Sequence, residues 1–159
     1  MLQFKSKIVS ALSCAVILAI MASFSGIKGG GEGFEIFLNN KLVLQQFNQQ
    51  LKDVKDIQLD NRYSNDNLVI KYHHCGRVGK DRTVSIRNAQ NKILKEWKFG
   101  NVSTASVIIS DAGMACKVKD ILSLQKANPG KLSLHYSSSE LPKGRMLATL
   151  STAELVKAK

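Results

Sequence analysis

Short apolar runs separated by turn residues fill most of the chain after residue 33. Within several of these runs, apolar and polar positions alternate. Alternation with a period of two is typical of a β-strand that buries one face and exposes the other. The pattern therefore predicts a domain built mainly from short strands.

The first two runs, residues 34–38 and 42–47, are joined by Asn39 and Asn40. Asparagine tolerates a positive φ, which a tight two-residue hairpin turn needs at both central positions. The pair therefore predicts a hairpin in which Ile36 lies opposite Val43. The buried face of this hairpin would then hold Phe34, Ile36, Leu38 and Val43.

Further strands follow from the same pattern. They are predicted at residues 57–59, 68–74, 83–87, 93–99, 105–109, 132–136 and 145–150. Val84 and Ile86 face one way on their strand, and Ile93, Trp97 and Phe99 do so on the next, where Lys95 interrupts the apolar side. The turn between these two strands is Asn88-Ala89-Gln90-Asn91.

One segment changes to helical spacing. Over residues 115–126, the residues expected to face the core are Val118, Ile121, Leu122 and Gln125. Ser110 or Asp111 is a candidate cap at its start, and Asn128-Pro129-Gly130 ends it. The chain is therefore predicted to be mainly β, as an antiparallel two-sheet β-sandwich with one short helix, with an immunoglobulin-like arrangement among the options. An α+β sheet with the helix on one face is the alternative.

The first 25 residues have the pattern of a secretory signal peptide. Lys5 and Lys7 form a basic start, residues 8–20 carry no charge, and Ser23 and Ser25 suit a cut before Gly26. The apolar run is shorter than the roughly 20 residues of a membrane span. An uncleaved N-terminal anchor is the alternative. The expected organisation is a signal peptide at 1–25, a glycine-rich leader at 26–33, a β-rich domain at 34–150 and a tail at 151–159.

Removing the signal changes the charge and the cysteine count. The net charge of +11 falls to +9 because Lys5 and Lys7 leave without an acid. Cys14 also lies in the signal peptide, so the mature chain would keep only Cys75 and Cys116. Two cysteines in an exported chain favour one disulfide, although the sequence leaves open whether they are close in space.

The basic residues are unevenly spread. Residues 71–98 carry eight bases against two acids. A basic band of this kind either keeps a surface soluble or favours an anionic partner such as a membrane surface or an acidic glycan, while export argues against nucleic acid. The candidate anion-binding residues are Arg77, Lys80, Arg82 and Arg87.

Soft metal ligands gather at two places in the sequence. Imidazole, thiolate and thioether groups suit copper or zinc, and the candidate set is His73, Cys75, Met114 and Cys116. His74 would point away from this set, because neighbouring side chains of a strand face opposite sides. A Cys75–Cys116 disulfide would use both thiolates and compete with a metal.

Hydrolytic motifs are absent from the sequence, with no Gly-x-Ser-x-Gly elbow and no His-Glu-x-x-His. His135 is interpreted as a hydrogen-bonded histidine on the solvent face of a strand, and Trp97 as a core residue. The leading hypothesis is an exported, periplasmic or extracellular, non-catalytic binding or structural module, whose expected partner is an acidic envelope component or another envelope protein. The alternatives are a copper- or zinc-handling protein and a small secreted enzyme.

Overall fold

A computed structural model of the protein describes residues 31–101 and 113–152. The expected signal peptide, most of the leader, the strand expected at 105–109 and the tail from residue 153 lie outside the described residues. The strands are β1 (Gly33–Leu38), β2 (Lys41–Phe47), β3 (Lys55–Leu59), β4 (Asn67–His73), β5 (Arg82–Arg87), β6 (Ile93–Phe99), β7 (Met114–Lys117), β8 (Leu132–Ser138) and β9 (Leu141–Thr152). One α-helix, α2 (Val118–Ala127), and two short 3-10 helices, η1 (Asn48–Lys52) and η2 (Asn61–Tyr63), complete the described elements.

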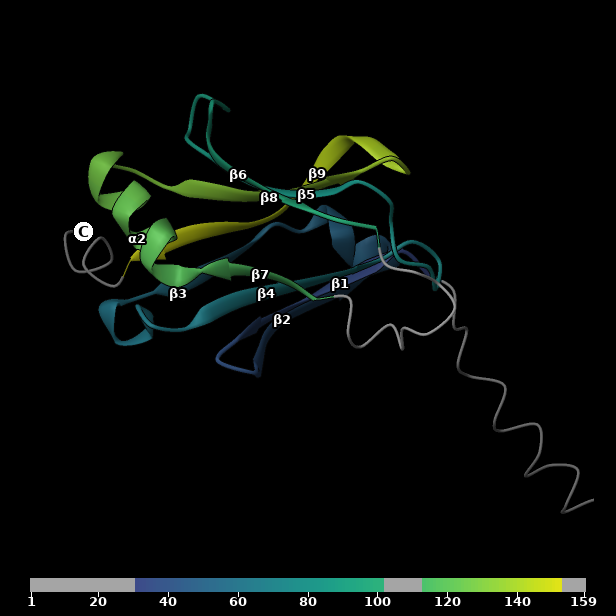
Figure 1. Cartoon of the computed structure of the whole chain (residues 1–159), viewed down its shortest axis with the longest axis horizontal. Coiled ribbons are helices and arrows are strands. Elements are labelled where there is room, and N and C mark those ends of the chain that lie inside the picture. The colour runs from purple at the N-terminus through teal and green to yellow at the C-terminus, as the bar shows by residue number, and fades with distance from the viewer. Residues whose placement is uncertain (1–30, 102–112, 153–159) are drawn as a thin grey trace, which may run out of the picture.

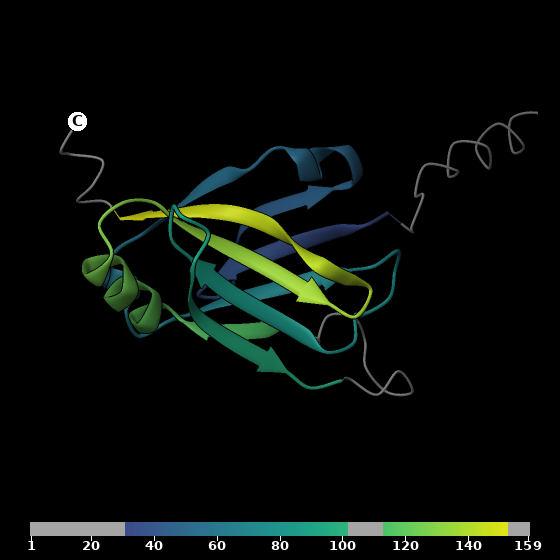
Figure 2. The same ribbon diagram turned by 90° about the horizontal axis from the view of Figure 1, so that it is seen from above.

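The strands form two sheets that pack face to face (Figure 1). The four-stranded sheet has the order β2-β1-β4-β7, and the five-stranded sheet has the order β3-β9-β8-β5-β6. Neighbouring strands are antiparallel except for β3 and β9, which run parallel. The prediction of a mainly β sandwich with one short helix is thus confirmed. Seen from above, α2 lies at one end of the two sheets (Figure 2).

The first hairpin confirms the predicted turn and corrects the predicted register. Asn39 and Asn40 have φ angles of 49° and 60°, as a tight hairpin turn requires. However, Ile36 pairs with Leu44 instead of Val43, because a bulge follows Ile36 and inserts one extra residue into β2. The predicted burial of Val43 is therefore wrong, and its side chain is 41% exposed.

The helix begins later than predicted. Met114 and Cys116 belong to β7, where they face inward and pair with β4, and α2 starts only at Val118. Alternate burial along residues 114–117 is the signature of a strand, and the helical spacing applies only from Val118 onward. The residues predicted to face the core are buried, namely Val118, Ile121, Leu122 and Gln125. Lys117 takes the N-cap position.

The core fills the space between the two sheets. Its largest fully buried side chains come from both sheets and from α2, and include Phe34, Ile36, Leu68, Ile70, Ile86, Ile121, Leu134 and Tyr136. Trp97 packs against this core from the edge strand β6 and is only half-buried. β5 and β8 pair with each other along their length, so these two strands reach both ends of the sandwich, where the candidate sites lie.

Candidate functional site

The predicted disulfide is wrong, because Cys75 and Cys116 are free cysteines at distant places. Cys116 lies opposite Leu68 in the β4–β7 pair, whereas Cys75 lies seven residues further along the chain, past the end of β4. At about 3.3 Å per residue, this separation is roughly 20 Å. A disulfide needs Cα atoms within about 7 Å of each other.

The candidate metal ligands are not brought together either. Met114 and Cys116 point into the core, and burial raises the pKa of the Cys116 thiol to about 12. His73 lies on the outer face of the four-stranded sheet, where its Nε2 is 3.6 Å from Glu35 Oε2, and Cys75 is exposed in a turn. Among the residues that the structure describes, no group of three or more His, Cys, Asp or Glu side chains has the geometry to hold a metal ion.

The four candidate anion-binding residues occupy three different environments. Arg77 and Lys80 are exposed in the connection between β4 and β5. Arg82 is only 5% exposed, and its Nη2 donates to the Gly100 carbonyl at 3.0 Å. Arg87 lies at the opposite end of β5, roughly 16 Å further along the strand. Only Arg77 and Lys80 therefore share an exposed segment.

The richest polar group lies between the sheets at the end where β4 and β8 finish. We call this group the His74 cluster and this end of the sandwich the His74 end. The cluster draws its members from the start of β1, the end of β4 and the β8–β9 hairpin, and it contains Glu32, Tyr72, His74, Tyr136, Ser138 and Arg145.

Aromatic rings form the base of the His74 cluster. The rings of Tyr72 and Tyr136 stack with centroids 4.2 Å apart, and the His74 ring lies 4.8 Å from that of Tyr72. Tyr72 comes from the four-stranded sheet and Tyr136 from the five-stranded sheet, so the stack joins the two layers. Burial raises the pKa of both phenols and keeps them neutral.

Glu32 connects three members of the cluster. Its carboxylate accepts a hydrogen bond from the Tyr72 hydroxyl at 2.7 Å and one from Arg145 Nη2 at 2.9 Å. His74 Nδ1 lies 4.0 Å from the same carboxylate. Sequence reasoning placed Glu32 in a flexible leader, but β1 already begins at Gly33 and the Glu32 side chain is fixed by the domain.

The other ring nitrogen of His74 lies 3.1 Å from the Tyr136 hydroxyl and 3.1 Å from Ser138 Oγ. A carboxylate, an imidazole and a serine in this order resemble the parts of a base-activated nucleophile. However, Ser138 is only 5% exposed, and its Oγ also accepts the backbone N–H of Leu141. The arrangement therefore serves to hold the β8–β9 hairpin against β4.

Burial also decides the state of the histidines. Desolvation lowers the pKa of His74, which favours the neutral ring between its hydroxyl partners. His135 was expected on a solvent face, but it is only 9% exposed and lies 3.1 Å from Ser133 Oγ. Burial, with a smaller contribution from Arg87, lowers the pKa of His135 to about 4. The prediction of a solvent-facing His135 is wrong, because β8 is an inner strand of its sheet with neighbours on both sides.

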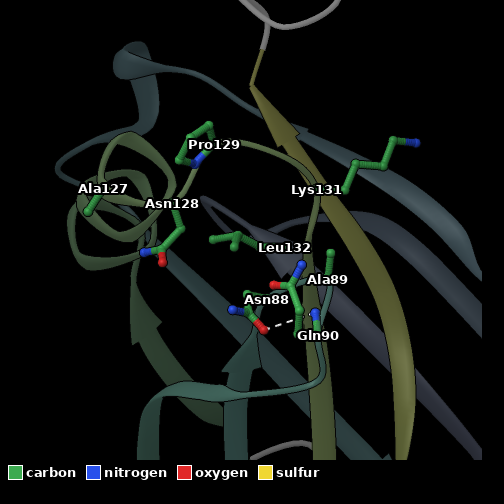
Figure 3. Close-up of a pocket in the computed structure, with 8 residues that line it drawn as sticks. All are labelled: Asn88, Ala89, Gln90, Ala127, Asn128, Pro129, Lys131 and Leu132. Atoms are coloured by element: carbon green, nitrogen blue, oxygen red, sulfur yellow. Dashed lines mark hydrogen bonds between the residues drawn. The ribbon is translucent and has the colours of Figure 1, made fainter.

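A cavity of about 220 Å³ lies at the opposite end of the sandwich, beside the C-terminus of α2 (Figure 3). We call this end the pocket end. The cavity is formed by the β5–β6 turn and by the connection from α2 to β8. Its lining residues are Asn88, Ala89, Gln90, Ala127, Asn128, Pro129, Lys131 and Leu132.

Two asparagines of the pocket have fixed orientations. Asn88 Oδ1 accepts the backbone N–H groups of Gln90 and Lys92 at 3.1 and 2.9 Å, so its amide nitrogen faces away from the turn backbone. Asn128 Nδ2 donates to the Leu124 carbonyl at 2.8 Å, which leaves its Oδ1 as an acceptor. Sequence reasoning identified both residues as turn and helix-end signals only. No local pattern could show that the two turns meet.

The site and fold define this chain as a two-sheet β-sandwich with a small polar pocket at one end. Comparisons with protein-family models, with curated proteins and with solved structures found no match. In the described ranges, 31–101 and 113–152, no helix is long and apolar enough to cross a membrane.

Proposed function

We propose that this protein is an exported, non-catalytic binding module that acts in the cell envelope or the extracellular space. Its first 25 residues support export through the basic pair Lys5 and Lys7, the uncharged run at 8–20 and the small residues before Gly26. The basic balance of the remaining chain favours an anionic envelope component as the partner.

The observation that carries the binding role is the pocket at the end of the sandwich. It is formed by connecting segments on a rigid pair of sheets, which is where binding residues concentrate in many domains. Asn88 and Asn128 line it, and within the described residues neither Asn88 Nδ2 nor Asn128 Oδ1 makes a hydrogen bond. Polar groups arranged in this way are available to a ligand.

The His74 cluster supports a non-catalytic assignment. In its most reactive pair, Ser138 is buried and His74 is only partly exposed, and both are satisfied by neighbouring groups. A catalytic serine needs an open site beside it and donors aimed at the oxyanion that forms. The backbone N–H of Leu141 already donates to Ser138 Oγ itself at 3.2 Å.

Export is tested by the intact mass of the protein recovered from outside the cytoplasm, after alkylation under native conditions. We expect a chain that starts near Gly26 and carries one alkyl group, because Cys75 is exposed while the Cys116 thiol is buried with a raised pKa. Unfolding before alkylation should add the second group without a reducing agent. A chain found only in the cytoplasm with its first 25 residues intact would contradict export.

Binding is tested by sedimenting the purified exported chain with the insoluble envelope fraction of the source cells. Saturable co-sedimentation that weakens as salt is raised is the expected result, because surface charge interactions are screened over about 10 Å at 0.1 M salt. A protein that stays in the supernatant at every concentration would contradict a binding role in the envelope.

A further inference from the structure

We infer that the pocket at the end of the sandwich binds a sugar ring that carries a carboxylate, as in one uronic-acid unit of an acidic glycan. This inference rests on the proposed binding function and names its ligand. Three features carry it, which are the fixed hydrogen-bonding pattern of the lining amides, the small size of the cavity, and the surrounding charge.

The amide groups set a mixed pattern of donors and acceptors. Asn88 presents Nδ2 as a donor because its oxygen holds the turn, and Asn128 presents Oδ1 as an acceptor because its nitrogen caps α2. The exposed Gln90 amide adds one group of each kind. A ligand must therefore offer hydroxyl hydrogens as well as oxygen acceptors, as adjacent hydroxyl groups of a sugar do.

The cavity matches one small ring. Its volume of about 220 Å³ lies below the roughly 300 Å³ at which the pockets of drug-sized ligands begin. Leu132, which is buried, and Ala89, Ala127 and Pro129 supply the apolar part of the lining. Figure 3 shows these apolar residues interleaved with the amide groups.

The charge around the pocket favours a carboxylate on the ring. Lys131 lines the cavity with a side chain that is 67% exposed. Arg87 and Lys92 flank the β5–β6 turn, and Lys126 is in the last turn of α2. Asp56 is 3.7 Å from Lys131, but its carboxylate also accepts from Thr149 and Ser151 on β9. The Lys131 ammonium can therefore turn to a ligand carboxylate at little cost, since exposed ion pairs contribute about 1 kcal/mol or less.

The test is an NMR titration of the exported chain with glucuronate, using glucose as the uncharged probe. Backbone amide shifts should move at residues 88–90 and 127–132 with glucuronate, and the same residues should respond more weakly to glucose. Replacing one charge-assisted contact changes binding by about tenfold. Lys131→Gln should therefore weaken glucuronate binding about tenfold and leave glucose binding unchanged.

Lys143→Gln is the matched control, because Lys143 is an exposed lysine of β9 at the His74 end. It should bind glucuronate like the unchanged chain, and Gln90→Ala should weaken both sugars. Equal responses to glucuronate and glucose, or shifts outside the pocket, would overturn the inference. If glucuronate fails while the chain still sediments with the envelope, the ligand is wrong and the binding function stands. If both fail, the binding function fails too.

Discussion

The two ends of the sandwich use polar residues in opposite ways. At the His74 end, the Glu32 carboxylate accepts hydrogen bonds from Tyr72 and Arg145 between the sheets, although Arg145 Nε finds no partner among the described residues. At the pocket end, Asn88 and Asn128 each use one half of the amide to hold the backbone, and the other half makes no hydrogen bond to the described residues. A buried polar group that lacks a partner costs about 1–3 kcal/mol, so the hydrogen bonds of the first arrangement stabilise the fold, and the second is tolerated because it remains open to water or a ligand.

The largest expected effect comes from crowding the His74 end at Gly79. A Cβ on Gly79 would lie 2.5 Å from the Tyr136 hydroxyl and 2.9 Å from His74 Nε2, so Gly79→Ala must displace both groups. We expect a loss of about 3 kcal/mol in the free energy of unfolding, measured by urea denaturation. Gly100→Ala is the control, since nothing lies within 4 Å of its Cβ position, and it should change stability by less than about 0.5 kcal/mol. Equal midpoints for the two variants would contradict the tight packing of the cluster.

Acid is expected to weaken the fold through its buried histidines. The pKa of His135 is about 4 in the folded chain against the ordinary value of 6.5, so the unfolded chain binds more protons between these values. The neutral His135 side chain therefore makes its full contribution to the free energy of unfolding above about pH 6.5, and this contribution is lost as the pH falls toward 4. The loss between about pH 7 and pH 5 should be about 2 kcal/mol. His135→Gln should remove most of this slope in urea titrations at several pH values, and an unchanged slope would contradict the burial of His135.

A smaller effect is expected at the Glu32–Arg145 ion pair. Glu32→Gln keeps an acceptor for Tyr72 but removes the charge that faces Arg145, and both side chains are about 30% exposed. We expect a loss of about 1 kcal/mol, and a double-mutant cycle with Arg145→Met should assign most of it to the pair. Glu35→Gln is the control on the outer face of β1, where the carboxylate accepts from exposed Gln45 and lies 3.6 Å from His73 Nε2. An equal loss in both variants would show that Glu32 has no special role.

Local patterns in the sequence correctly predicted those elements that depend on interactions between residues close together in the chain. The Asn39-Asn40 turn, the inward alternation of Val84 and Ile86 and the helical spacing from Val118 all reappear in the structure. The errors arise where pairing with a neighbouring strand determines the register or the type of secondary structure. The bulge after Ile36 moved Val43 to the surface, and the pairing of residues 114–117 with β4 replaced the first predicted turn of the helix.

The candidate site was less accessible to sequence reasoning, because its residues are far apart in the chain. Glu32 and Arg145 are 113 positions apart in the sequence. The glycines around Glu32 indicated only a flexible leader. The two cysteines carried a strong compositional signal, but only the strand register shows that they lie far apart. The pocket arises where two turns meet, and turn residues predict a change of direction without predicting what lies next to it.

The smallest expected effect separates ligand binding from folding at the pocket end. The Gln90 side chain is exposed at the tip of the β5–β6 turn, so Gln90→Ala should change the free energy of unfolding by less than about 0.5 kcal/mol. Asn88→Ala should cost about 1 kcal/mol, because Asn88 Oδ1 holds two backbone N–H groups of the same turn. Urea midpoints of the two variants test this order. If Gln90→Ala destabilised the chain as much as Asn88→Ala, the pocket amides would be part of the folding core, and the contrast between the two ends would be lost.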